Sequence, residues 1–376
     1  MQAGPAPEPL PRLSQLAQKL VVGPGVAPAA SLAVARHGPR GWAIGVGAAG
    51  RHRGSRPITP ATPFDLASVT KPFVATVLAR LASGEGPAMD TPLGELLEEA
   101  RGTASDDVPL ELLASHRSGL EAHRPLFQVL VGRRGVDRSA LFAEAADARR
   151  EDCTGRPPRG GFPPVYSDLG YLLLGEALAR AHATPLDRLV EREVVVPLGL
   201  DAAPSRGWLG REPTFSERVA PTEHVAWRGG ELVGVVHDEN AWTLGGHGLS
   251  GHAGLFATAG SVARFGAALV DALAGRRSAW LPAQAALGLV RQRPGGTLRA
   301  GFDGLSPAGS SAGGVCGPST FGHLGFTGTS LWCDPDAGAI AVLLTNRVNP
   351  SREHTAIRAA RPRVHDALFT LARSGW

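Results

Sequence analysis

Three residue types are scarce in this 376-residue chain, which has three cysteines, two tyrosines and, among 38 lysines and arginines, only two lysines. Cys153, Cys316 and Cys333 are widely spaced and odd in number. This pattern predicts no disulfide framework and no CxxC metal pair, and it is typical of a reducing compartment. The two lysines are Lys19 and Lys71, and we ask below why Lys71 is not an arginine.

Long hydrophobic runs are also missing. No stretch of 18 apolar residues occurs, and the N-terminal segment lacks the continuous apolar core of a signal peptide. We therefore expect no membrane partner and a cytoplasmic location; a periplasmic or secreted protein is expected only if a signal peptide preceded the first printed residue.

The net charge of +4 is small for this length, and aromatic residues do not alternate with the basic ones. Nucleic-acid binding is therefore not expected. The segments GAAG, GGHG and AGHAG form neither a P-loop nor a GxGxxG turn between a strand and a helix, so no nucleotide cofactor is expected.

Hydrophobic periodicity predicts strands near both ends of the chain and helices between them. A β-hairpin is expected over 31–38 and 41–50, and two further strands over 329–347. Helices are expected over 11–22, 93–100, 139–151, 169–183, 185–195, 261–275 and 354–373, with a glycine-rich passage over 241–260.

This order predicts an α+β fold in which an antiparallel sheet, built from N- and C-terminal segments, is flanked by helices. We expect a single domain over 1–376. Its sheet part would comprise about 1–85 plus 251–376, and 86–250 would form a mostly helical insertion. Chemistry is expected in the cleft between the two parts.

Ser68 and Lys71 lie at the head of a helix whose apolar residues occur on several faces. Positions i and i+3 share a helix face, so the two side chains are expected to be neighbours. Burial and the positive end of the helix dipole both favour a neutral lysine, which could accept the serine proton; arginine could not. The alternative is a helix-capping serine beside a surface lysine.

Two further motifs follow in the chain. Tyr166 precedes a helix whose N-cap is expected to be Ser167 or Asp168, and beside Lys71 its phenol would have a lowered pKa and could shuttle a proton. His323 and Gly325 precede a strand, where the glycine would let a substrate lie along the strand edge. A capping role for the first motif and a structural role for the histidine are the alternatives.

Together these motifs, Ser68-Val69-Thr70-Lys71, Tyr166-Ser167-Asp168 and His323-Leu324-Gly325, resemble those of the penicillin-recognising serine enzymes, specifically the class C β-lactamase branch. The family patterns are Ser-x-x-Lys, Tyr-x-Asn and Lys-Thr-Gly. Their order and separations agree from about residue 30 to the last helix. The supporting segments 112–120, 219–241, 251–265 and 343–350 look more like β-lactamase-related serine hydrolases than like true β-lactamases.

The resemblance implies a role for each matching residue. Ser68 would attack an acyl carbonyl, and Lys71 and Tyr166 would share the general-base work. The backbone N–H groups of Ser68 and Phe326 would form the oxyanion hole. Asn346 matches a family position that helps to receive a substrate carboxylate. No cofactor is implied.

Two departures from the family pattern concern substrate binding. Asp168 replaces an asparagine, and its charge would tend to keep Lys71 protonated. His323 replaces a lysine, so its attraction for a substrate carboxylate would vary with pH. Both departures favour substrates less acidic than a β-lactam.

His237, Asp238 and Glu239, with His247 and His252 nearby, could suggest a metal site, but no helical His-x-x-x-His spacing is present. We expect no metal, and we expect a loop that lines the substrate pocket, with His237 and Asp238 as contacts.

The sequence thus predicts a serine hydrolase that acts through an acyl-enzyme on small-molecule esters or amides, among which peptidoglycan fragments are candidates. The alternatives are a true β-lactamase, a D-Ala-D-Ala carboxypeptidase, or a binding or scaffold protein without turnover. The sequence leaves the oligomeric state open.

Overall fold

The computed structural model describes residues 6–51, 56–276 and 280–376. Its main sheet has seven strands in the order β1-β3-β2-β12-β11-β10-β9, and all neighbours are antiparallel except the short edge pair β1 and β3. The sheet therefore joins both ends of the chain, as predicted for an α+β fold. Its strands are β1 (Glu8–Pro9), β2 (Ala29–Gly38), β3 (Gly41–Gly50), β9 (Asp303–Gly304), β10 (Phe321–Leu324), β11 (Ser330–Asp334) and β12 (Ala339–Thr345).

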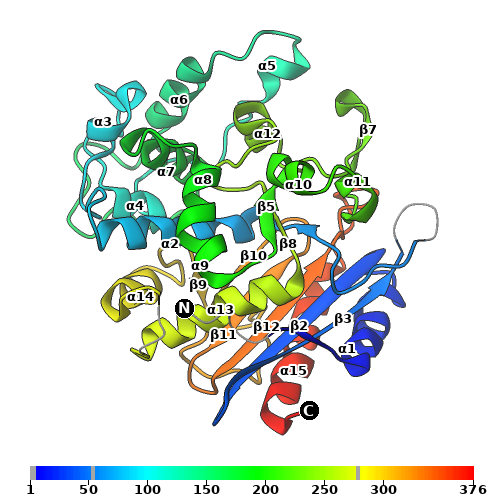
Figure 1. Cartoon of the computed structure of the whole chain (residues 1–376). Helices are drawn as coiled ribbons and strands as arrows, with labels where there is room; N and C mark the ends of the chain where they lie inside the picture. Colours follow the sequence, from blue (N-terminus) through cyan, green and yellow to red (C-terminus); the bar gives the residue numbers. More distant parts are fainter. Residues whose placement is uncertain (1–5, 52–55, 277–279) are drawn as a thin grey trace.

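Both faces of this sheet are buried by helices. In β12, Ile340, Val342 and Leu344 pack with α13 (Ala259–Leu273), whereas the alternating residues pack with α1 (Pro11–Ala17) and α15 (Ile357–Ser374). Because side chains alternate between two buried faces, β12 is apolar at every position from Ala339 to Leu344. Figure 1 shows α13 crossing one face of the sheet, with α1 and α15 on the other side.

The remaining helices gather on the α13 side of the sheet, mostly in the upper half of Figure 1. Two short sheets lie outside the main one: β4 (Phe64–Asp65), β8 (Leu255–Ala257) and β5 (Ala202–Pro204) form the first, and β6 (His224–Val225) and β7 (Gly230–Glu231) form the second. The helices are α2 (Thr70–Ala82), α3 (Leu93–Leu96), α4 (Leu110–Ala114), α5 (Gln128–Val131), α6 (Arg138–Asp147), α7 (Asp168–Ala181), α8 (Leu186–Val190), α9 (Val196–Leu198), α10 (Ser205–Arg211), α11 (Phe215–Arg218), α12 (Glu239–Gly245) and α14 (Ala283–Val290).

Most predicted elements are present, including the hairpin, the two C-terminal strands and the final helix. No helix or strand was predicted for the glycine-rich passage over 241–260. In the structure its first residues belong to α12, and residues 255–257 form β8. Asp238 caps α12 by accepting a hydrogen bond from the Ala241 N–H at 2.8 Å, which explains a helix in this setting. The proposed division into parts 1–85 plus 251–376 and 86–250 stays a prediction.

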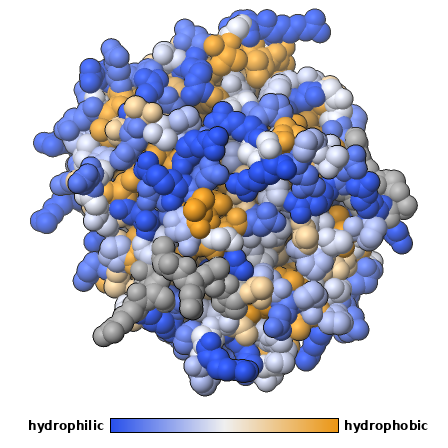
Figure 2. All heavy atoms as spheres, in the orientation of Figure 1, coloured by the Kyte–Doolittle hydropathy of each residue, from blue (hydrophilic) through white to orange (hydrophobic). Residues whose placement is uncertain are grey.

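The face of the molecule in Figure 2 is mainly hydrophilic, with small separate hydrophobic areas. In the part of the chain that the structure describes, no helix has both the length and the apolar character needed to cross a membrane.

Candidate active site

Ser68 lies in a 3-10 turn, Ala67–Val69, directly before α2. Ala67 has a φ of +46°, an unusual value for a residue with a side chain, and its N–H donates to Asp65 Oδ1 at 2.8 Å. Strained backbone of this kind often occurs at functional sites, where the surrounding structure holds it in place. Ser68 remains partly exposed while its chain neighbours are buried, so the turn presents the hydroxyl to a cavity.

Lys71 follows in the first turn of α2, and its side chain is completely buried. Its Nζ lies 3.0 Å from Ser68 Oγ, 2.6 Å from Asp168 Oδ1 and 3.4 Å from the His252 carbonyl oxygen. The Ser68 and Lys71 side chains are therefore in contact, as predicted, and the alternative that Lys71 is a surface residue is wrong.

Two opposing effects were expected for Lys71, and the structure decides between them: the neutral form expected from burial is wrong, and the protonating effect expected of Asp168 is confirmed. Burial by itself lowers the pKa of the amine, but the interactions of the amine with the Asp168 carboxylate and, after it, with Tyr166 more than offset that effect, and the pKa of Lys71 is raised. A buried lysine becomes neutral only where no opposite charge compensates for its lost hydration. At neutral pH this lysine is therefore a cation paired with Asp168.

Tyr166 lies beside Lys71, whose Nζ is 4.8 Å from the centre of the phenol ring. The pKa of Tyr166 is nevertheless raised, because removal of the phenol from bulk water outweighs the effect of the Lys71 cation. The expected lowering of this pKa is therefore wrong, and Tyr166 keeps its proton at neutral pH. The N-cap expectation is confirmed: Ser167 Oγ accepts from the Gly170 N–H at 3.2 Å.

His323 and Gly325 line the same cavity at the end of β10. His323 Nδ1 donates to the Leu324 carbonyl at 2.8 Å, and burial lowers the pKa of the imidazole to about 3. The expectation that its charge varies near neutral pH is therefore wrong. Gly325 has no room for a side chain, because a Cβ would lie 2.5 Å from the Leu66 carbonyl oxygen.

Asn346 does not offer its amide to the cavity. Its Oδ1 accepts from the Ala29 N–H and its Nδ2 donates to the Pro221 carbonyl, both at 3.0 Å, and the residue is buried. These bonds tie the start of β2 to the segment before β6. The role of carboxylate receiver expected for Asn346 is not supported.

His237 and Asp238 line the cavity but have separate partners. His237 Nε2 is 2.8 Å from Glu223 Oε2, its ring stacks on Phe326 at 5.7 Å, and Asp238 Oδ1 is 2.8 Å from His252 Nε2. Among the residues that the structure describes, no group of three or more His, Cys, Asp or Glu side chains is arranged to hold a metal ion.

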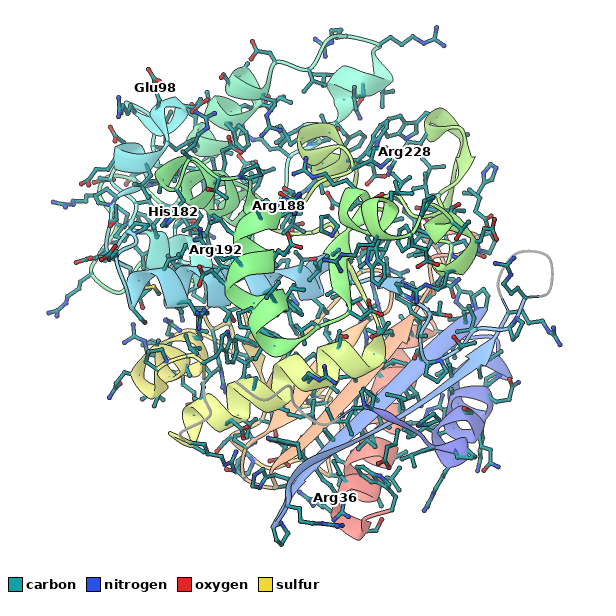
Figure 3. The ribbon with its side chains drawn as sticks, in the orientation of Figure 1. Arg36, Glu98, His182, Arg188, Arg192 and Arg228 are labelled. Carbon is teal, nitrogen blue, oxygen red and sulfur yellow. The ribbon has the colours of Figure 1, made fainter. Side chains whose placement is uncertain are left out.

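The cavity has a volume of about 720 Å³. Ser68, Tyr166 and Asp168 lie in its wall together with an apolar side that includes Pro125, Phe127 and Phe326. Trp227 stacks on Phe127 with 5.8 Å between ring centres, and it contacts Trp242. The guanidinium of Arg228, which is labelled in Figure 3, lies over the Trp242 ring. Trp227 thus adds an aromatic ring that packs against Phe127.

The family model described as "Beta-lactamase" matches residues 16–364. The chain belongs to the β-lactamase family.

A relative from Salmonella agona, named "Putative D-alanyl-D-alanine carboxypeptidase", is 30% identical over an aligned length of 236 residues, and the match covers 57% of this chain and 52% of the relative. The chain therefore spans about half the length of that relative. Among solved structures, EstCE1, "a hydrolase with promiscuous acyltransferase activity", has a TM-score of 0.66 at 20% identity, with 93% of this chain and 97% of that one covered. A class C β-lactamase has a TM-score of 0.67 at 16% identity, with 96% of both chains covered. These likenesses confirm the predicted fold.

Besides Arg352, which forms ion pairs with Glu223 and Glu239, three arginines line this β-lactamase-family cavity and were not predicted from the sequence. Arg347, Arg358 and Arg361 line it from the end of β12 and the first turns of α15. Arginine is so common in this chain that composition does not distinguish these three, although Arg347 directly follows the matched Asn346.

His116 was also missed as an individual residue, although it falls in the supporting segment 112–120. Its Nδ1 accepts from the Ser167 N–H at 3.0 Å, and its ring lies 4.7 Å from that of Tyr166. Burial lowers the pKa of His116 well below its ordinary value. The neutral His116 ring therefore packs against the Tyr166 ring.

Proposed function

We propose that this protein is a serine hydrolase that acts through an acyl-enzyme on small ester or amide substrates. The observation that carries the proposal is the 3.0 Å separation of Lys71 Nζ and Ser68 Oγ at the wall of a substrate-sized cavity. A nucleophile within hydrogen-bonding distance of a potential base is the recognised signature of covalent catalysis.

In the proposed reaction, Ser68 Oγ attacks the acyl carbonyl as its proton passes to the unprotonated fraction of Lys71. Tyr166 relays the proton to the leaving group, and the alcohol or amine departs. Water then attacks the acyl-enzyme with the same groups acting in reverse. The N–H groups of Ser68 and Phe326 stabilise the oxyanion in both halves of the reaction.

The substrate would lie with its acyl carbonyl between Ser68 and Phe326. The apolar side at Phe127 suits a hydrophobic substituent, and the neutral His323 supplies no fixed positive charge at the position where the family has a lysine. Small neutral esters therefore match the immediate surroundings of Ser68, and uncharged peptidoglycan fragments are candidates for the amide substrates.

The arginines favour a second candidate, the hydrolysis of an anionic substrate such as a D-alanyl-D-alanine terminus or a β-lactam. Arg358 is exposed at the cavity, and no hydrogen bond or ion pair to its guanidinium comes from the residues that the structure describes. Its charge lies near Arg347 and Arg361, whose pKa values are lowered by burial and then by the repulsion that Arg358 contributes. A substrate carboxylate would relieve that repulsion.

Intact-mass measurement after treatment with a fluorophosphonate tests the proposal. We expect one adduct on the wild-type protein and none on Ser68→Ala, because only an activated serine reacts. An unmodified wild-type protein would instead support a binding or scaffold protein without turnover.

Parallel assays with p-nitrophenyl esters, nitrocefin and muropeptides then separate the two candidates. Preferential turnover of the neutral esters supports the first candidate, whereas faster turnover of nitrocefin or of the anionic muropeptides supports the second.

A further inference from the structure

Two arginines donate hydrogen bonds to two consecutive carbonyl groups, those of Gly325 and Phe326. Arg361 Nη2 donates to the Gly325 carbonyl at 2.7 Å, and Arg347 Nε donates to the Phe326 carbonyl at 2.7 Å. The Gly325 carbonyl and the Phe326 N–H belong to the same planar peptide unit. A group that holds this carbonyl therefore also sets the direction of the N–H.

We propose that Arg361 is a positioning residue for the oxyanion hole, where it orients and polarises the Gly325–Phe326 peptide so that the Phe326 N–H becomes a stronger, better-aimed donor. The inference rests on the proposed function, in which this N–H stabilises the oxyanion. Arg361 acts through the peptide and has no contact with the reacting atoms.

The peptide is well placed for this role. Arg361 Nη2 also donates to the Thr329 carbonyl at 3.0 Å, and Thr329 Oγ1 donates to the Leu66 carbonyl at 2.8 Å. The turn that contains Phe326 is thereby clamped to the segment that leads into Ser68. No described residue accepts a hydrogen bond from the Phe326 N–H, which leaves it available to a substrate oxygen.

The position of Arg361 carries an energetic cost that a purely structural tie would not require. Arg361 is only 8% exposed, and its Nε is buried without a hydrogen-bond partner. No carboxylate among the described residues lies within ion-pair distance of its guanidinium. Burial and the nearby Arg347 and Arg358 lower the pKa of Arg361 to about 10, so the guanidinium stays charged at neutral pH.

A neutral donor could connect α15 to this turn at lower cost, since burying an unpaired cation is unfavourable. What a cation adds is a charge-assisted hydrogen bond. Hydrogen bonds in a chain polarise one another, so a cation on the carbonyl strengthens the N–H of the same peptide as a donor. The benefit is realised only when negative charge develops opposite that N–H.

The experiment compares Arg361→Met and Arg361→Gln with Arg363→Met, a change of an exposed arginine on the same helix. The measurements are kcat and KM for a neutral p-nitrophenyl ester and the affinity for phenylboronic acid, whose serine adduct places an oxygen in the oxyanion hole. The fluorophosphonate adduct is first established on the wild-type protein.

We expect Arg361→Met and Arg361→Gln to lower kcat by about 10- to 100-fold, less than the loss of a whole donor, with little change in KM. Boronate affinity should fall by a similar factor, and Arg363→Met should match the wild type. If Arg361→Met does not fold, Arg361→Gln decides by the same measurements.

Wild-type kcat and boronate affinity in a folded Arg361 variant would overturn the inference. A lower kcat with unchanged boronate affinity would also overturn it, because that pattern indicates a structural role only. Absence of the fluorophosphonate adduct on the wild-type protein is a different failure, which removes the proposed function itself.

Discussion

Lys71 and Asp168 form an ion pair in the wall of the cavity, with 2.6 Å between Nζ and Oδ1. The Lys71 side chain is fully buried, whereas 23% of the Asp168 side chain is exposed. The carboxylate therefore stabilises the ammonium form of the residue that is expected to accept the Ser68 proton. Asp168 thus sets how much of Lys71 is available as a base.

We expect Asp168→Asn to increase activity at neutral pH. The asparagine oxygen can still accept a hydrogen bond from Lys71, but burial then lowers the pKa of the amine without an opposing charge. The base form exists above this pKa, so the acidic limb of kcat/KM should move to lower pH. pH–rate profiles on a neutral ester measure the shift, with the exposed Asp90→Asn as control; an unmoved limb would contradict the role assigned to Asp168.

The two tyrosines provide a matched pair of substitutions. Tyr166→Phe removes the proposed proton relay and should lower kcat by about 100-fold or more. Tyr171 Oη donates to the Ala114 carbonyl at 2.7 Å, away from the reacting atoms. Tyr171→Phe should therefore reduce the free energy of unfolding by about 1 kcal/mol and leave kcat unchanged. Equal losses of kcat in steady-state assays of both variants would argue against a relay at Tyr166.

Discrimination between anionic and neutral substrates should depend on Arg358 and not on the titration of His323. Because the pKa of His323 is about 3, the ratio of kcat/KM for an anionic ester to that for its neutral analogue should stay constant through neutral pH. Arg358→Gln should raise KM for the anionic ester roughly tenfold, which corresponds to one charge-assisted contact, and spare the neutral one. Arg40→Gln, an exposed change in the β2–β3 turn, is the control. A ratio that falls as pH rises through neutrality would restore the carboxylate-binding role to His323.

His365 should make stability depend on acid pH. It is buried between Ser330 and Ser311, and burial lowers its pKa to about 3. Between about pH 3 and pH 6.5 the unfolded chain binds a proton at this position and the folded chain does not, so the fold loses stability as pH falls. His365→Gln should reduce the slope of unfolding free energy against pH by about 1.4 kcal/mol per unit in that window. Urea titrations at several pH values measure the slope. The same slope in His365→Gln as in the exposed His354→Gln would show that His365 does not titrate on unfolding.

The contacts that could be predicted from the sequence are those made within one element or fixed by a strand pattern. Ser68 and Lys71 are three residues apart at the start of a helix, so their proximity follows from helix geometry. The β2–β3 hairpin and the alternating strands β11 and β12 follow from the apolar pattern and the turn residues between them. Tyr166 was found through its motif and its rarity rather than through a predicted contact.

The errors concern groups whose properties depend on distant neighbours. The amide of Asn346 matched a family motif, yet its bonds go to Ala29 and to Pro221, residues 317 and 125 positions away. No local pattern distinguishes an amide used in this way from a free one. The role of Arg361 could not be predicted for the same reason. Its contact with the turn at Gly325 arises only when α15 packs beside the end of β10.

By itself the sequence determined the α+β architecture and the presence of a serine and a lysine on one turn, because these follow from periodicity and short spacing, and the resemblance of its three motifs indicated the family. Only the tertiary structure decided which forms the ionisable groups adopt. Lys71 and Asp168 are 97 residues apart in the chain, and folding buries them in contact. Because a pKa depends on the charges and the water within a few ångströms, whatever their place in the sequence, the protonation of this site is a property of the folded molecule.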